Sequence, residues 1–264
     1  MGGTAAGRWA VPADWPRRVG ALVRGEVTPV VPRLSATVLL LRDGAAGIEV
    51  FLLRRRTSMA FAAGMYAYPG GAAEADDASP AYTAVRETYE ETGVLFAGPA
   101  GGPPGSLAAQ EPDDGRAFAD VLARRALVAR TELLAPWARW ITPEFEPRRY
   151  DTWFWVAALP DGQRCANAST EADRTAWLRP ADALAGYGRG AYAMLPPTVA
   201  TLRRLLPYAE DGARAADVRD AAAAAPEPEP VLARVGTDGD ALVVTWPGYA
   251  EFDIRLPGPS ASGE

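Results

Sequence analysis

The chain has 264 residues, enough to bury a substantial core, and its length favours one large domain with additions over several independent domains. Its 27 basic residues, all of them arginines, and its 33 acidic residues give a net charge of −6. This balance leaves no broad positive face for a nucleic-acid backbone, so we expect no nucleic-acid partner. The sequence also lacks histidine, which excludes imidazole as a proton carrier or zinc ligand, so carboxylates become the obvious reactive groups.

Two features bear on the cellular compartment. The single cysteine, Cys165, cannot form an internal disulfide, which suits a reducing environment. The first 18 residues lack the unbroken apolar core of a signal peptide, and no later stretch is long enough to span a bilayer. We therefore expect a soluble, cytoplasmic protein with no membrane partner.

Composition divides the chain into four predicted segments. Strand and helix patterns alternate in the second segment, whereas the third is rich in alanine, proline and glutamate, as linkers are. The segments are residues 1–33, an N-terminal lead-in; 34–210, the main domain; 211–230, a linker; and 231–264, a C-terminal β-hairpin extension.

The first firm elements of the main domain are two strands. Residues 35–43 and 48–56 are rich in aliphatic and β-branched side chains, which favour strands. The short, turn-like spacer between them predicts an antiparallel hairpin. Residues 63–71 are expected to form a short extended piece that ends in Pro-Gly-Gly, a sequence that permits unusual backbone angles.

A helix is predicted over residues 80–92. Ser79 is a good N-cap, Pro80 suits the first helical position, and Gly93 suits the left-handed conformation that ends many helices. Further elements are expected downstream from aliphatic spacing and from proline positions. They are a helix within 116–135, a strand at 149–160, a strand and a Pro-started helix within 175–185, and a helix from Pro196.

The predicted helix 80–92 carries an unusual concentration of acid. With residues placed 100° apart, Glu87, Glu90 and Glu91 lie within an arc of about 100°, opposite a face that can pack. Glu87 and Glu91 repel each other at i,i+4, and the negative C-terminal end of the helix dipole adds to the cost. A hard divalent cation would remove this penalty, because carboxylate oxygens are its preferred ligands.

Residues 70–94, which contain this helix, resemble the Nudix box of the Nudix hydrolase family, usually G-x5-E-x7-R-E-U-x-E-E-x-G-U with U apolar. The matching positions are Gly71, Arg86, Glu87, Glu90, Glu91, Gly93 and Val94, with Thr88 at the first apolar position. Asp77 replaces the upstream glutamate, and eight residues rather than seven separate it from Arg86. This variant is similar to that of the coenzyme A diphosphatase branch. The segments 51–71, 136–160 and 195–205 also resemble acyl-coenzyme A diphosphatases.

The resemblance implies a fold, a metal site and an activity. The implied fold is the Nudix α/β/α sandwich with a mixed β-sheet. The implied cofactor is Mg²⁺ or Mn²⁺, held by Glu87, Glu90, Glu91 and the backbone carbonyl of Gly70, with Arg86 orienting the glutamates. The implied activity is hydrolysis of a diphosphate linkage in a nucleotide-type small molecule.

The substrate, the general base and the assembly state stay open at this stage. CoA or acyl-CoA is favoured, giving 3',5'-ADP and a phosphopantetheine fragment. ADP-ribose, a dinucleotide or a nucleoside triphosphate is an alternative substrate, and a non-catalytic, ligand-binding regulator is an alternative function. A homodimer is also allowed.

Several charged residues are candidates for catalysis or for substrate binding. Glu87 and Glu171 are the candidate general bases, with Glu144 and Glu146 as fallbacks. Guanidinium groups pair bidentately with phosphates, so four arginines near predicted strand ends are candidate phosphate ligands. These arginines are Arg54, Arg56, Arg148 and Arg149.

Overall fold

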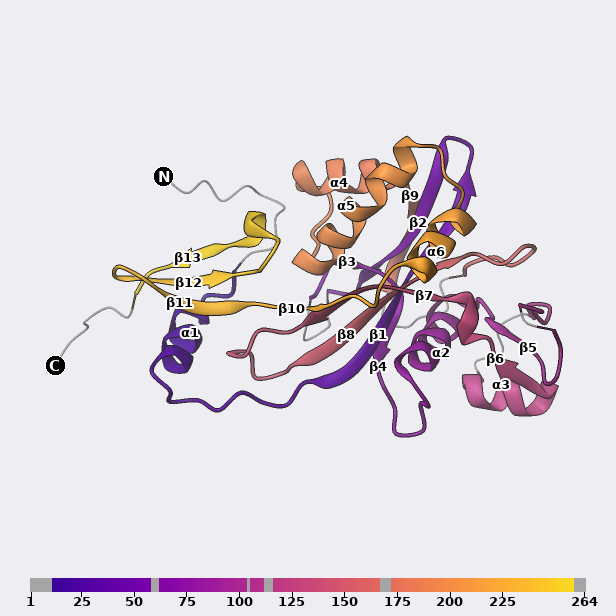
Figure 1. Ribbon diagram of the computed structural model, residues 1–264, viewed down its shortest axis with the longest axis horizontal. Coiled ribbons are helices and arrows are strands. Elements are labelled where there is room, and N and C mark those ends of the chain that lie inside the picture. The colour runs from indigo at the N-terminus through magenta and orange to yellow at the C-terminus, as the bar shows by residue number, and fades with distance from the viewer. Residues whose placement is uncertain (1–10, 58–61, 104, 112–115, 167–171, 259–264) are drawn as a thin grey trace.

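The computed structural model describes the chain except residues 1–10, 58–61, 104, 112–115, 167–171 and 259–264. Its centre is a mixed eight-stranded sheet (Figure 1). The strands of this sheet are β1 (Arg33–Gly44), β2 (Gly47–Arg55), β3 (Tyr66–Ala67), β4 (Gly70–Ala72), β7 (Ala135–Ile141), β8 (Tyr150–Ala158), β9 (Ala172–Leu178) and β10 (Pro230–Leu232).

The order of the strands in the sheet is β10-β7-β8-β1-β2-β3, with β4 also paired to β1 and β9 to β2. β1 runs parallel to β8, and β10 runs parallel to β7, whereas the remaining pairs are antiparallel. The predicted hairpin of residues 35–43 and 48–56 is confirmed as β1 and β2. The predicted mixed-sheet α/β fold is confirmed as well.

Helices cover both faces of the sheet (Figure 1). α2 (Pro80–Thr92) and α3 (Phe118–Arg125) belong to one face, together with the short strands β5 (Ala97–Pro99) and β6 (Leu127–Ala129) and the 3₁₀ turn η1 (Thr131–Leu133). α4 (Pro180–Gly188), α5 (Pro196–Glu210) and α6 (Ala215–Ala224) belong to the other face. The arrangement is therefore an α/β/α sandwich.

Each face has its own apolar core, because alternate side chains of β1 point to opposite sides of the sheet. Val38 and Leu40 pack with Val85 of α2, whereas Leu39 and Leu41 belong to the core under α4, α5 and α6. These β1 side chains are fully buried, and each contributes on the order of 2 kcal/mol to folding. The long apolar run of β1 is explained by this two-sided burial.

The helix predicted within 116–135 is confirmed only over its first part, as α3. α3 ends at Arg125, and Ala126 adopts a left-handed conformation with φ of 50°. The following residues form β6, which pairs with β5, and then η1 and β7. Aliphatic spacing alone did not distinguish a helix from a short helix followed by strands, because the backbone reversal occurs at an alanine, which carries no turn signal.

The segment 211–230, predicted as a linker, contains α6 and leads into β10. Ala215, Val218 and Ala222 are buried against the sheet. Alanine has the highest intrinsic helix propensity, and its small side chain allows close packing. The alanine-rich composition that predicted a linker therefore forms a docked helix.

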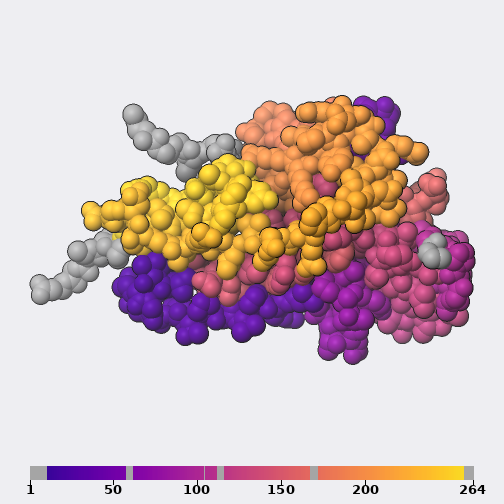
Figure 2. All heavy atoms as spheres, viewed as in Figure 1, coloured from indigo at the N-terminus to yellow at the C-terminus, as the bar shows by residue number. Residues whose placement is uncertain are grey.

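The two ends of the described chain pack together instead of forming a simple lead-in and hairpin. The N-terminal segment contains α1 (Trp15–Val23), and the C-terminal segment contains β11 (Arg234–Asp238), β12 (Ala241–Thr245), the 3₁₀ turn η2 (Ala250–Phe252) and β13 (Ile254–Leu256). β11, β12 and β13 form a three-stranded antiparallel sheet. Trp15 of α1 and Leu242 of β12 share the larger core, and Figure 2 shows the C-terminal residues in yellow against the indigo N-terminal part.

Candidate metal-dependent active site

The acidic cluster lies on α2, whose ends are set by local sequence signals. The Ser79 hydroxyl accepts a hydrogen bond from the Tyr82 amide at 3.1 Å, Pro80 opens the helix, and Gly93 ends it with φ of 73°. These features confirm the boundaries predicted from the sequence. Ala84 and Val85 are fully buried in the core beneath the helix, so the register of α2 fixes where its glutamates point.

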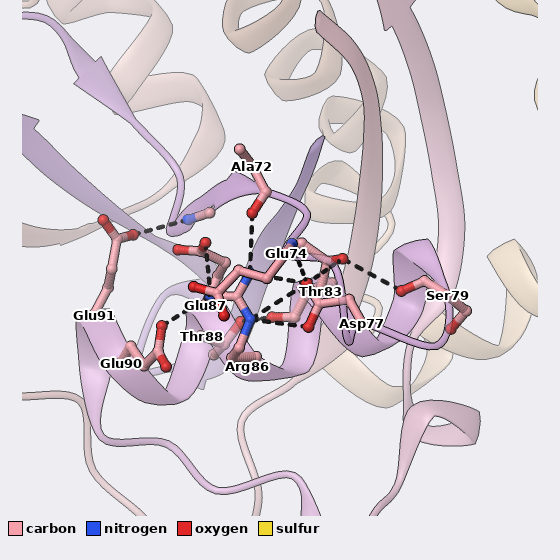
Figure 3. Close-up of polar contacts among 12 residues, drawn as sticks. Ala72, Glu74, Asp77, Ser79, Thr83, Arg86, Glu87, Thr88, Glu90 and Glu91 are labelled. Atoms are coloured by element: carbon pink, nitrogen blue, oxygen red, sulfur yellow. Dashed lines mark hydrogen bonds and ion pairs between the residues drawn. The ribbon is translucent and has the colours of Figure 1, made fainter. Parts of the chain in front are cut away.

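Arg86 is the centre of the cluster (Figure 3). It is buried, and its Nη1 donates to Glu87 Oε1 at 3.0 Å and to Glu90 Oε2 at 2.9 Å. Its Nη2 donates to Asp77 Oδ2 at 2.9 Å and to the carbonyl of Ala72 at 3.0 Å. One guanidinium thus joins two glutamates of the helix to the loop that precedes it.

Asp77 anchors this guanidinium, and its side chain is only 3% exposed. The Thr83 hydroxyl and the Glu74 amide donate to Asp77 Oδ2 at 2.9 and 3.0 Å. Burial by itself would raise the pKa of Asp77, but the hydrogen bonds from Arg86, Glu74 and Thr83 together lower it. The sequence identified Asp77 as a replacement in the box, but its pairing with Arg86 is visible only in the structure.

Glu87 lies against the backbone of Gly71. A Cβ atom at Gly71 would meet Glu87 Oε1 at 2.5 Å, so a side chain at position 71 would displace this carboxylate. Burial raises the pKa of Glu87 to about 7, although the neighbouring Arg86 opposes this rise. The site therefore holds a carboxylate whose negative charge is poorly solvated.

Glu91, about one turn further along α2, is tied to the same glycine pair. Its Oε2 accepts a hydrogen bond from the Gly70 amide at 2.8 Å, and the residue is 8% exposed. Gly70 has φ of 153°, and a Cβ atom there would lie 2.4 Å from the carbonyl oxygen of Ala36. A side chain at position 70 would therefore force β4 away from β1.

The donor set suits a hard divalent cation. Glu87, Glu90 and Glu91 supply carboxylate oxygens on adjacent turns, and the cradle at Gly71 would be filled by any Cβ atom. Within the described ranges, no group of three or more acidic or cysteine side chains is arranged so that it could hold a metal ion directly. The contacts explain this, because Arg86 takes up Glu87 and Glu90 while the Gly70 amide takes up Glu91.

The candidate phosphate-binding arginines differ in their surroundings. Arg54 forms a bidentate pair with Asp173, at 2.7 and 2.6 Å. Arg56 and Arg148 are exposed. Arg149 is buried and donates to the backbone carbonyls of Thr142 and Val30, at 3.0 and 2.7 Å. The prediction of Arg149 as a phosphate ligand is thus at odds with the structure, because its guanidinium holds the chain before β1 to the β7–β8 turn.

The candidate general bases lie in different parts of the chain. Glu87 lies within the cluster, whereas Glu171 lies outside the described residues. Glu146 accepts hydrogen bonds from Trp15 Nε1 and from Arg18, so its carboxylate is engaged with α1. An acid that the sequence did not indicate is Glu74, whose side chain is 70% exposed and lies 3.8 Å from Arg86 Nη1.

The chain is similar to known proteins in both sequence and structure. Residues 81–205 match the family described as the NUDT19 Nudix domain. The crystal structure of a NUDIX hydrolase from Alicyclobacillus acidocaldarius is 31% identical, with a TM-score of 0.56, and the match covers 67% of this chain and 92% of that one.

Two curated relatives are matched over parts of their length. Nudix hydrolase 7 of Caenorhabditis elegans is 28% identical over 167 residues, covering 60% of this chain and 55% of the nematode protein. A nudix hydrolase of Schizosaccharomyces pombe is 36% identical over 63 residues, covering 24% of this chain and 22% of the yeast protein. The match thus spans about half of the first relative and less than a quarter of the second.

None of the described helices is both long and apolar enough to cross a bilayer.

Proposed function

Because the chain belongs to the Nudix hydrolase family, we propose that it hydrolyses the diphosphate linkage of a nucleoside diphosphate derivative with the help of a divalent cation. One observation carries this proposal. Glu87 and Glu91 lie beside the glycine pair 70–71, and Arg86 joins Glu87 to Glu90. Such a cluster supplies the oxygen ligands that a diphosphate-bound cation requires.

The proposed cation is Mg²⁺ or Mn²⁺, held by Glu87, Glu90, Glu91 and the backbone carbonyl of Gly70. When bound, it offsets the charge of the phosphate oxygens and lowers the pKa of a bound water.

The roles of the neighbouring side chains follow from their contacts. Arg86 orients Glu87 and Glu90, since it donates to both, and Asp77 fixes Arg86 from the loop. Glu87 and Glu171 are the candidates for accepting the proton of the attacking water.

We propose CoA or acyl-CoA as the substrate, with 3',5'-ADP and an (acyl-)phosphopantetheine as products. The support is the resemblance of the box variant, and of the segments outside the box, to acyl-coenzyme A diphosphatases. Arg54, Arg56 and Arg148 are proposed to contact substrate phosphates. Arg56 and Arg148 are exposed, whereas Arg54 would exchange Asp173 for phosphate.

A substrate panel tests this proposal. Purified protein is incubated with Mg²⁺ or Mn²⁺ and CoA, acyl-CoA, ADP-ribose, NADH, a dinucleotide or a nucleoside triphosphate, and the products are identified by mass spectrometry. Cleavage of CoA esters to 3',5'-ADP is the expected result. Cleavage of ADP-ribose, a dinucleotide or a nucleoside triphosphate with CoA left intact would contradict the substrate assignment. Absence of cleavage together with ligand binding would indicate a non-catalytic regulator.

A further inference from the structure

We propose that Tyr68 and Thr201 are positioning residues, which hold the Gly70 end of the acidic site in place through helix α5. This inference rests on the proposed function, because it concerns the same cation site. Tyr68 and Thr201 lie in two segments that share the acyl-coenzyme A diphosphatase resemblance, but neither is part of the box.

The link begins with a hydrogen bond inside the core. The Tyr68 side chain is buried, and its hydroxyl lies 3.0 Å from Thr201 Oγ1 and 3.2 Å from the Thr198 carbonyl oxygen. The Thr201 hydroxyl has one proton, and the carbonyls of Pro197 and Thr198, at 2.7 and 3.1 Å, are available to accept it. We therefore assign Tyr68 as the donor to α5. The tyrosine ring also packs edge-on against Phe154 of the sheet.

The two residues after Tyr68 are fixed by two other elements. The carbonyl of Pro69 accepts from the Val38 amide at 2.9 Å and from the Thr37 hydroxyl at 2.7 Å, both on β1. The Gly70 amide then donates to Glu91 on α2. Three consecutive residues are thus bound to α5, β1 and α2.

This segment has little room to move. A Cβ atom at Gly70 would lie 2.4 Å from a β1 carbonyl oxygen, which shows how closely β4 and β1 approach each other. α2 and α5 belong to opposite faces of the sheet, so the 68–70 segment connects a helix of one core to the acidic helix over the other. Loss of the bond to α5 is therefore expected to loosen Gly70 and Glu91 together.

The test measures Mn²⁺ binding directly, by the EPR signal of free Mn²⁺, alongside kcat and KM with the substrate that the panel identifies. Tyr68→Phe and Thr201→Val each remove one hydroxyl and keep most of the packing. Each is expected to weaken Mn²⁺ binding on the order of tenfold and to lower kcat with little change in KM. The double variant is expected to be no worse than Tyr68→Phe alone, because Tyr68→Phe already removes the contacts of this hydroxyl with Thr201 and with the Thr198 carbonyl.

Two further variants separate positioning from general loss of stability. Thr201→Ser retains the hydroxyl and is expected to bind Mn²⁺ like the wild type, although it loses a buried methyl group. Tyr208→Phe removes a hydroxyl near the other end of α5, where the ring packs against Trp137, and it is expected to change neither binding nor kcat.

The outcomes distinguish the inference from the proposed function. If the wild type binds Mn²⁺ and cleaves substrate while Tyr68→Phe and Thr201→Val do so equally well, the positioning role is wrong and the proposed function stands. If Thr201→Ser is as impaired as Thr201→Val, the hydroxyl is not the group that matters, and the inference also fails. If the wild type neither binds Mn²⁺ nor cleaves any diphosphate, the proposed function fails and the inference fails with it.

Discussion

A single residue, Arg86, balances the negative charge of the acidic site. This guanidinium contacts Asp77, Glu87 and Glu90, while Glu74 lies 3.8 Å away. Without it, Glu87 and Glu90 would repel each other across one turn of α2, with little water to screen them around Glu87. The arginine therefore holds the acids together, and the acids fix the orientation of the arginine.

Glu90→Gln tests the proposed cation site with little risk to the fold. The side chain of Glu90 is 33% exposed, so loss of its ion pair with Arg86 is expected to change the free energy of unfolding by less than about 1 kcal/mol. Loss of an outer-shell partner alone costs about 10- to 100-fold in metal affinity or activity, so loss of a ligand is expected to cost more. Measurements of kcat with Mg²⁺ and of thermal unfolding check both expectations. If Glu90→Gln turned over substrate as fast as the wild type, Glu90 would not be a ligand of the cation.

Asp77→Ala is expected to act on stability as well as on activity. It leaves the buried Arg86 guanidinium with a weaker set of partners, a change that costs about 3 to 5 kcal/mol in buried pairs. Chemical denaturation measures the loss. The matched control is Asp173→Ala, which breaks the more exposed pair with Arg54 and is expected to cost less than about 1 kcal/mol. Equal losses from both variants would show that Asp77 is an ordinary surface partner.

At the scale of elements, the site depends on how α2, β4 and β1 approach one another. Ser79 and Gly93 set the ends of α2, and the glycines at 70 and 71 let β4 approach both β1 and the carboxylate of Glu87. On the opposite face, α6 is tied to the β1–β2 hairpin because Asp43 accepts hydrogen bonds from the Ala215 amide and from Arg214. Local capping and close backbone contacts thus determine where the side chains of the site lie.

The docking of α6 predicts a specific pH dependence. The hydrogen bond from the Ala215 amide, aided by Arg214, holds the pKa of Asp43 below its ordinary value of 3.8. Ionised Asp43 therefore stabilises the folded state above about pH 4, and this contribution is lost as the pH falls through the lowered pKa. The stability difference between the wild type and Asp43→Asn, measured by urea unfolding, is expected to be largest at neutral pH and to shrink below pH 4. A constant difference from pH 7 to pH 2.5 would contradict this prediction.

At the scale of the whole molecule, the sheet separates two cores, and the C-terminal strands complete the larger one. Trp140 of β7 packs against Tyr249 and Phe252, with ring centroids 4.8 and 6.5 Å apart. Trp15 of α1 packs edge-on against Phe145 at the same end of the molecule. The segments at both ends of the described chain are therefore part of the folded unit.

Phe252→Ala tests whether this C-terminal region supports the fold without acting on the site. Truncation of a buried phenylalanine is expected to lower the free energy of unfolding by about 3 to 5 kcal/mol. Mn²⁺ binding by the folded protein is expected to stay unchanged, since the Phe252 ring packs against Trp140 and Tyr249, whereas the Tyr68 ring packs against Phe154. Val31→Ala, at a residue 83% exposed, serves as the control with no expected effect. Weakened Mn²⁺ binding in Phe252→Ala would show that the C-terminal region also acts on the site.

Elements whose signals are local could be predicted from the amino-acid sequence. The ends of α2, the β1–β2 hairpin and the acidic face were predictable, because caps, turns and side-chain periodicity act within a few neighbouring residues. By contrast, the pairing of Asp77 with Arg86, the contact of Tyr68 with Thr201 and the docking of the alanine-rich segment as α6 became visible only in the folded chain. These contacts depend on which segments approach each other in the fold, and a hydrogen bond between distant residues leaves no periodic pattern in the chain.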